Sequence, residues 1–246
     1  MLIDVVLENN STYKPHYYNE LWKKLIEEMF EEFIVFFAPN LQEVIDFTKP
    51  PVFLQHSELE PIFSKDNLQT ATVHILKAPL RNQTEKWLFI HIPNREMSLD
   101  DFRKSMFQYF YSVFDHFNQE VYGIALLTNR NTHPRQNYYS YHYYGTSLTY
   151  TYHVVNFLEL NVNRLQKSSN PFAIVVLAEL FNNKTKLHDK RRYSIKRDLL
   201  ISVYQRFTAG KSGVNSMLLL HFIDHLLIIP KAYQETLEKE LIHYRK

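Results

Sequence analysis

The sequence has 246 residues and a mass of 29.6 kDa, which fits one elaborated domain or two small ones. Its 28 Lys and Arg residues nearly balance its 26 Asp and Glu residues, so the formal charge of +2 excludes a histone-like polycation and an acidic-tail protein. The absence of cysteine excludes disulfide scaffolds, zinc ribbons and thiol nucleophiles, and only 4 glycines argue against a loop that cradles a nucleotide phosphate.

The first predicted element is an amphipathic helix over residues 21–37, where apolar side chains recur at spacings of three and four. Pro39 ends this helix. Three strand-like runs follow at residues 51–59, 70–78 and 87–92. The third run is continuously apolar, which is typical of a central strand that is buried on both faces.

The next part of the chain predicts a second helix over residues 99–117 and a buried strand over residues 121–127. A tyrosine-rich hairpin is expected after this strand, with its two strands at residues 138–144 and 148–157 and a turn near Gly145. These elements complete the order helix, three strands, helix, strand, with the hairpin added to it.

After Asn161 the pattern becomes helical. The predicted helices cover residues 171–181, 184–207, 214–229 and 232–244. We therefore expect an α/β core with an aromatic hairpin over residues 1–160, followed by a C-terminal helical module over residues 161–246.

No segment has the roughly 18 uncharged apolar residues that a membrane span needs. The opening stretch, MLIDVVLENN, has neither a basic region nor a long apolar core, so it does not fit a secretory signal. We therefore expect a cytoplasmic protein without a membrane partner.

The order of the elements is that of a restriction-endonuclease-like core, and several sequence blocks have a more specific likeness. These blocks are LWKKLIEEMFEEF at 21–33, IDF at 45–47, FL at 53–54, EL at 58–59, EKWLFIHI at 85–92, DF at 101–102, MFQYFY at 106–111, YGT at 144–146, NPFA at 170–173 and FID at 222–224. With these blocks, residues 19–241 resemble the recombination-promoting nuclease (Rpn), or YhgA-like transposase, family.

The resemblance implies a PD-(D/E)XK nuclease fold, in which an Asp on the second strand and a Glu on the third hold Mg²⁺. A Gln or Lys two residues after the Glu orients water or substrate. In this chain Pro93 stands at the Glu position and Arg95 at the Gln position, and the Asp position falls at or just before Thr72. Because none of these side chains is a carboxylate, we predict a degenerate catalytic site with no cofactor.

The alternative prediction is an active, Mg²⁺-dependent DNA endonuclease with a displaced site. Glu58, Asp66 and Glu96 are the candidate carboxylates for it, and Glu58 matches a family Glu. The competing interpretation of Asp66 and Glu96 is that they are solvated residues at strand ends.

Three other patterns could mark binding sites. A basic stretch over residues 184–197 offers Arg191, Arg192 and Lys196 as contacts to nucleic-acid phosphates, although a solvated helix face has the same pattern. The hairpin tyrosines could stack on bases, or form a structural or protein-binding surface. His221 and His225 lie four apart on one helix face, where packing competes with a metal site.

His91 lies on the predicted central strand, where we expect a buried and hydrogen-bonded side chain.

Three functions remain open at this point. The chain is a degenerate family member that binds nucleic acid or a protein partner, an active endonuclease with a displaced site, or an assembly or regulatory module. The partners considered are DNA, another protein and a second copy of the chain.

Overall fold

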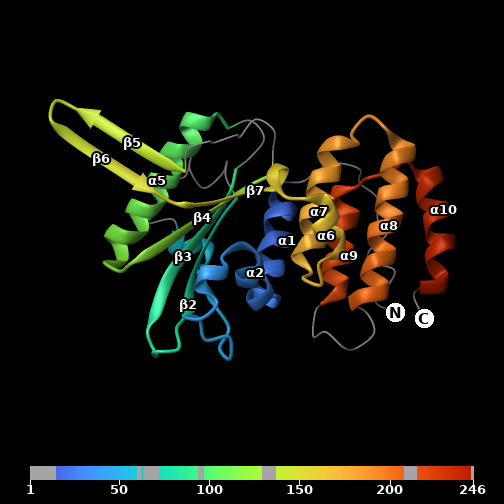
Figure 1. Cartoon of the computed structure of the whole chain (residues 1–246), viewed down its shortest axis with the longest axis horizontal. Helices are drawn as coiled ribbons and strands as arrows, with labels where there is room; N and C mark the ends of the chain where they lie inside the picture. The colour runs from blue at the N-terminus through green and yellow to red at the C-terminus, as the bar shows by residue number, and fades with distance from the viewer. Residues whose placement is uncertain are drawn as a thin grey trace.

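The chain folds into a mixed α/β structure with a five-stranded sheet and a separate two-stranded hairpin (Figure 1). The computed structural model describes residues 15–59, 62–63, 72–93, 97–128, 137–207 and 215–244. Its strands are β1 (Val52–Phe53), β2 (Thr72–Pro79), β3 (Glu85–Ile92), β4 (Val121–Leu127), β5 (Tyr138–Tyr143), β6 (Thr146–Thr151) and β7 (His153–Asn156). The large sheet has the order β1-β2-β3-β4-β7, with β1 to β3 antiparallel and β3, β4 and β7 parallel.

The described residues form helices that pack on both faces of this sheet and helices of the C-terminal part that pack beside them. They are α1 (Pro15–Glu28), α2 (Phe30–Phe37), α3 (His56–Leu59), α5 (Leu99–Phe117), α6 (Val162–Lys167), α7 (Phe172–Lys184), α8 (Asp189–Phe207), α9 (Ser216–Leu226) and α10 (Lys231–Leu241), with short 3-10 turns η2 (Pro39–Leu41), η3 (Phe157–Glu159) and η4 (Ile242–Tyr244). Side chains alternate along β3, so Phe89 packs in the core beneath α5 while Ile90 packs in the core that contains α1 and α2. Within the described ranges, no helix has the length and apolar character required to cross a membrane.

The predicted helix over residues 21–37 is found as two helices. Met29 separates α1 from α2, because its backbone angles (φ −128°, ψ 47°) are not helical. The Met29 N–H still donates to the carbonyl of Leu25, and its own carbonyl accepts from the Phe33 N–H. The apolar stripe therefore stays on one side through the break, and its members from Leu21 to Phe37 are buried as the spacing predicts.

The predicted strand over residues 51–59 is wrong for most of its length. Only β1 is extended there, and it pairs with β2 through Val52 and Phe53. The one-turn helix α3 follows, because the Glu58 carboxylate accepts a hydrogen bond from the Gln55 backbone N–H at 2.7 Å. This contact has the form of the second half of a capping box, which favours a helix start over a strand.

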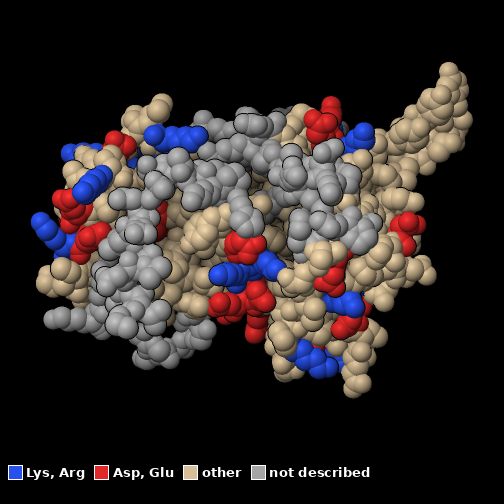
Figure 2. Space-filling model, turned by 180° about the vertical axis from the view of Figure 1, so that it is seen from behind, with Lys and Arg blue, Asp and Glu red and all other residues tan. Residues whose placement is uncertain are grey.

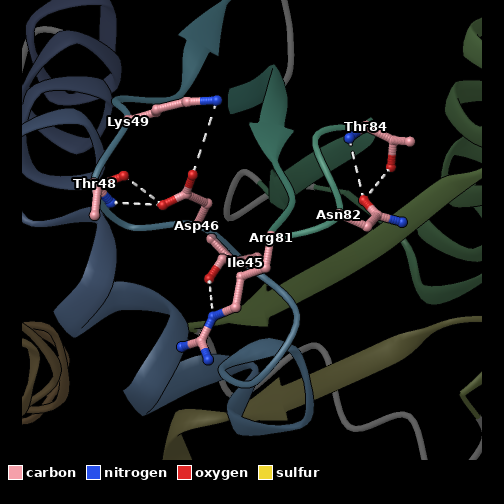
Figure 3. Close-up of polar contacts among 7 residues, drawn as sticks. All are labelled: Ile45, Asp46, Thr48, Lys49, Arg81, Asn82 and Thr84. Atoms are coloured by element: carbon pink, nitrogen blue, oxygen red, sulfur yellow. Dashed lines mark hydrogen bonds and ion pairs between the residues drawn. The ribbon is translucent and has the colours of Figure 1, made fainter.

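The loop after η2 is fastened to the turn between β2 and β3 (Figure 3). The Arg81 Nε donates to the Ile45 carbonyl at 3.1 Å, and the Asp46 N–H donates to the Pro79 carbonyl. The Asp46 carboxylate accepts from the hydroxyl and N–H of Thr48, and these hydrogen bonds lower its pKa. The family-like block at 45–47 therefore has a structural role in holding this loop.

The predicted bounds of α5 and β4 are confirmed without change. The Ser98 side chain accepts from the Asp101 N–H at the start of α5, and Asn118 ends the helix in the left-handed region at φ 48°. The hairpin differs from its prediction, because its second strand stops at Thr151. After Tyr152 the chain enters β7, which pairs in parallel with β4 of the large sheet.

The C-terminal residues form helices, as the pattern predicts. The basic stretch does not form one helix from residue 184, because α7 runs on to Lys184 and α8 starts only at Asp189. Every residue from Phe172 to Leu180 of α7 is buried, and one apolar cluster joins Phe172 to Trp22 of α1 and Ile90 of β3. The helical module and the sheet therefore share a hydrophobic core.

Candidate functional site

The end of the sheet where β2 begins and β3 ends is the first candidate site. Thr72 pairs with Ile92, so the resemblance-based positions Thr72 and Pro93 lie at the same end of this antiparallel ladder. Because β4 and β7 run parallel to β3, their carboxyl ends meet the same edge at Thr128 and Asn156. The side chain of Thr72 and all of Asp66, Arg95 and Glu96 lie outside the described residues.

The side chains that can be described at this end of β3 are buried. Pro93 is buried, and His91 is fully buried between rings of α5, with centroid distances of 5.2 Å to Phe102 and 5.1 Å to Tyr109. The predicted burial of His91 is confirmed. Among the described residues, neither ring nitrogen has a hydrogen-bond partner, so the expected hydrogen bond is not found there. Burial lowers the pKa of His91 to about 3, so the imidazole is neutral at pH 7.

Glu58 is the one displaced-site candidate whose contacts are described. Its carboxylate is occupied by the Gln55 N–H at the start of α3, at an exposed position. In the part of the chain that the structure describes, no group of three or more His, Asp or Glu side chains is arranged to hold a metal ion. Glu58 therefore acts as a helix-capping residue.

Two of the three residues chosen as phosphate contacts lie inside the helical module. The exposed fraction is 7% for Arg192 and 3% for Lys196, whereas Arg191 is exposed. The Arg192 guanidinium donates to the Asn182 carbonyl at 3.0 Å and to the Asn182 side-chain oxygen at 2.9 Å. It also donates to the Ile228 carbonyl at 3.2 Å. Because Arg192 is engaged inside the fold, it does not fit a contact to nucleic acid.

Lys196 is engaged in the same way. Its ammonium lies 2.8 Å from the Asp224 carboxylate and 3.4 Å from the Gln234 side-chain oxygen, to which it donates. These contacts join α8 to α9 and α10. Lys196 is buried and engaged within the helical module, so it too does not fit a contact to nucleic-acid phosphates.

The tyrosine-rich hairpin β5–β6 is the third candidate site. Its register places two kinds of side chain on two faces, because Tyr139 pairs with Tyr150 and Tyr141 pairs with Leu148, while Ser140 pairs with Thr149. We call the face that carries Tyr139, Tyr141, Tyr143, Thr146, Leu148 and Tyr150 the aromatic face. The opposite face carries Tyr138, Ser140, His142, Ser147, Thr149 and Thr151.

The base of the aromatic face packs against α5. The Tyr139 ring stacks on Phe107 at 5.2 Å, and the Tyr150 ring stacks on Phe110 at 4.4 Å. Tyr150 also lies over β4 at Gly123, where an added Cβ would stand 2.7 Å from the Tyr150 hydroxyl oxygen. Burial raises the pKa of the Tyr150 hydroxyl, as expected for an anchored ring.

Of the two histidines on α9, His225 has a described packing contact. The His225 ring meets the edge of the Tyr17 ring at 5.0 Å, and burial lowers the pKa of His225. Both observations support a packing role for His225 on this helix.

Comparisons of the chain with protein-family models, curated proteins and solved structures found no match.

Proposed function

We propose that this chain is a non-catalytic protein built on a PD-(D/E)XK-like core, and that it works by binding a protein partner. The order of elements supports the core assignment, because α1 and α2 precede the antiparallel strands β1 to β3, and α5 then leads to the parallel strand β4. The sequence blocks that resemble the Rpn family support it independently.

The carboxyl end of β3 carries the argument against catalysis. A nuclease of this class needs carboxylate oxygens there, because Mg²⁺ takes hard oxygen ligands. Here Pro93 is buried at the Glu position, and the nearby His91 is neutral and enclosed by Phe102 and Tyr109. The pyrrolidine ring of Pro93 has no side-chain oxygen that could bind a cation. The metal site expected from the family resemblance therefore lacks its ligand from the third strand.

The choice of a protein over a nucleic acid rests on charge. Phosphate binding draws its affinity from surface cations. Arg192 and Lys196 are committed inside the helical module, and the Arg197 guanidinium lies 3.0 Å from the Asp198 carboxylate. The aromatic hairpin adds no cation, since residues 137–158 contain no Asp, Glu, Lys or Arg.

A cleavage assay tests the absence of catalysis. We expect the purified chain with Mg²⁺ or Mn²⁺ to nick supercoiled plasmid no faster than buffer with the same metal. An authentic Mg²⁺-dependent nuclease in the same buffer serves as the positive control. Metal-dependent nicking that is lost in Glu58→Ala, Asp66→Ala or Glu96→Ala would overturn the proposal and establish a displaced site.

A restoration experiment tests the core assignment. The triple variant Thr72→Asp, Pro93→Glu, Arg95→Gln returns the family residues to both strand ends. We expect it to bind Mn²⁺ in a calorimetric titration, while the natural sequence and the single variant Arg95→Gln do not. A folded triple variant with no gain in Mn²⁺ affinity would count against the PD-(D/E)XK-like assignment.

The partner class is tested by DNA titration at two salt concentrations. We expect at most weak binding to DNA, because Arg192 and Lys196 are held inside the helical module and are not offered to phosphates. A tight, salt-sensitive complex that is weakened by Arg191→Ala would replace the protein partner with nucleic acid.

A further inference from the structure

The aromatic face of the hairpin extends beyond the helix that supports it. Tyr139 and Tyr150, at the base, stack on α5. Tyr141 and Tyr143, toward the tip, have exposed fractions of 44% and 62%, and Leu148 is exposed beside them. Figure 1 shows β5 and β6 projecting to one side of α5, away from the other labelled elements. The tip half of the face thus continues a packed surface with nothing described to cover it.

The tip of the hairpin carries a second unusual feature. Tyr144 and Gly145 form the two-residue turn, with φ values of 40° and 88°. This turn type favours Asn-Gly or Gly-Gly, because a bulky side chain disfavours the left-handed region. Tyr144 is nevertheless there and its exposed fraction is 94%. Tyr144 therefore occupies a backbone conformation that is unfavourable for tyrosine, and its side chain is not buried within the chain. This combination points to a role in contacts outside the chain.

The lack of charge on the hairpin narrows the choice of partner. Figure 2 shows the projecting arm without any blue or red side chain, in agreement with the uncharged run at residues 137–158. Natural proteins protect exposed strands and apolar faces with charged side chains, and this hairpin has none. Nucleic acid is disfavoured as a partner because the arm offers no cation to its phosphates. A charged protein surface is also disfavoured, because the arm has no opposite charges to pair with it.

We propose that the tip half of the aromatic face packs against the same surface of a second copy of this chain, around a two-fold axis. An isologous contact brings each residue near its own equivalent, so like charges would repel, and an uncharged arm avoids that repulsion. The contact covers Tyr141, Tyr143 and Leu148 of both copies and places Tyr144 at the rim. This inference rests on the proposed binding function and names its surface and partner.

Packing between copies also accounts for the stability of the arm. A two-stranded hairpin alone is marginally stable in water, and α5 supports only the base of this one. Two aromatic faces that stack at the ordinary sheet separation of about 10 Å would enclose the tip half of each arm between apolar layers.

The mass of the full chain in solution tests the proposal. By analytical ultracentrifugation between about 1 and 100 µM, we expect a concentration-dependent rise from 29.6 kDa to twice that mass. A mass that stays at 29.6 kDa over this whole range would overturn the proposal.

Single variants then locate the contact. Tyr143→Ser should raise the dissociation constant of the dimer at least about tenfold, because buried tyrosines dominate interface energies. His142→Ser is the matched control, since it changes the opposite face of the same strand and should leave the constant within about twofold. Equal effects of the two changes would contradict a contact through the aromatic face.

The turn offers a variant that should not harm the fold. Tyr144→Asn introduces the Asn-Gly pair that this turn favours, so the circular dichroism spectrum should be kept. We expect weaker dimerisation nonetheless, by about threefold or more. An unchanged dissociation constant of the dimer would show that Tyr144 takes no part in the contact, and would contradict its place at the rim.

Charge complementation shows whether the partner is a second copy. Leu148→Lys and Leu148→Glu should each be monomeric alone, and an equimolar mixture should recover the dimer mass through opposite charges. If both variants keep the wild-type mass, the proposal fails. These mass measurements do not involve cleavage, so failure of the dimer and failure of the non-catalytic function are seen separately.

Discussion

The sheet and the helical module both bury ionisable side chains, but they do so in different ways. In the sheet, His74 of β2 and His91 of β3 are buried, and burial lowers the pKa of each to about 3. In the helical module, Arg192 and Lys196 of α8 are equally buried but have hydrogen bonds and an ion pair. The sheet thus removes the charge, whereas the module surrounds the charge with partners.

The chemistry of the side chains explains this difference. An imidazole loses its proton at little cost near neutral pH, so it can lie between aromatic rings as a neutral group. A guanidinium cannot be deprotonated in a protein, so a buried arginine needs acceptors for its donors. Asn182, Thr185 and the Ile228 carbonyl supply them for Arg192. The polar contacts of Arg192 and Lys196 on α8 are therefore structural. His91 on β3 needs no such contacts, because its side chain is neutral.

The largest effect is expected from removing the arginine. Arg192→Met leaves the acceptors of Asn182 and Ile228 without a donor, so we expect a loss of about 4 kcal/mol in the free energy of unfolding. Arg191→Met, one residue away on the exposed side, should change it by less than about 0.5 kcal/mol. Urea titrations measure both variants, and a similar loss for the two would contradict the buried network.

Acid should destabilise the sheet through its histidines. An unfolded His91 takes up a proton below its ordinary pKa of about 6.5, whereas the folded one does so only near 3. The stability due to the neutral ring is thus complete above pH 6.5 and decreases as the pH falls toward 3. At pH 5 the decrease amounts to about 2 kcal/mol for each such histidine.

A variant isolates the contribution of His91. In His91→Leu, the drop in unfolding free energy between pH 7 and pH 5 should be smaller by about 2 kcal/mol than in the natural chain. His243→Leu changes an exposed histidine and should leave that drop as it is. Identical pH profiles for the natural chain and His91→Leu would show that His91 is not held neutral by burial.

The ion pair of α8 should show an asymmetric response. Asp224→Ala leaves the Lys196 ammonium buried without its carboxylate, and we expect a loss of about 1.5 kcal/mol because Asp224 itself is partly exposed. Lys196→Met removes the buried charge and should cost less than about 1 kcal/mol. A larger loss for Lys196→Met than for Asp224→Ala, by thermal or urea unfolding, would argue against this account.

The smallest effect concerns a contact between the two regions. The Tyr18 hydroxyl of α1 donates to the buried Glu179 carboxylate of α7 at 2.5 Å. Tyr18→Phe removes this donor, so we expect a loss of about 1 kcal/mol in unfolding free energy. Tyr17→Phe is the control on the exposed side of the same helix. If the control loses as much as Tyr18→Phe, the hydrogen bond does not stabilise the contact between α1 and α7.

Local sequence signals determined the elements whose ends depend on nearby residues. The bounds of α5 and β4 follow from the Ser98 cap, the apolar spacing and the left-handed Asn118. The helical character of α7, α8, α9 and α10 follows from the periodicity of their apolar side chains. The positions of Thr72, Pro93 and Arg95 as former site residues stay a prediction from the family resemblance.

Only the tertiary structure decided which polar groups face inward. The same basic stretch contains exposed Arg191 and buried Arg192, and periodicity cannot tell them apart until Asn182 and Ile228 are brought beside α8. Likewise, no local signal ends the hairpin at Thr151, because the switch into β7 depends on pairing with β4, about thirty residues earlier in the chain. Contacts between distant segments set both outcomes, since a buried charge or a sheet edge is stable only beside its partner.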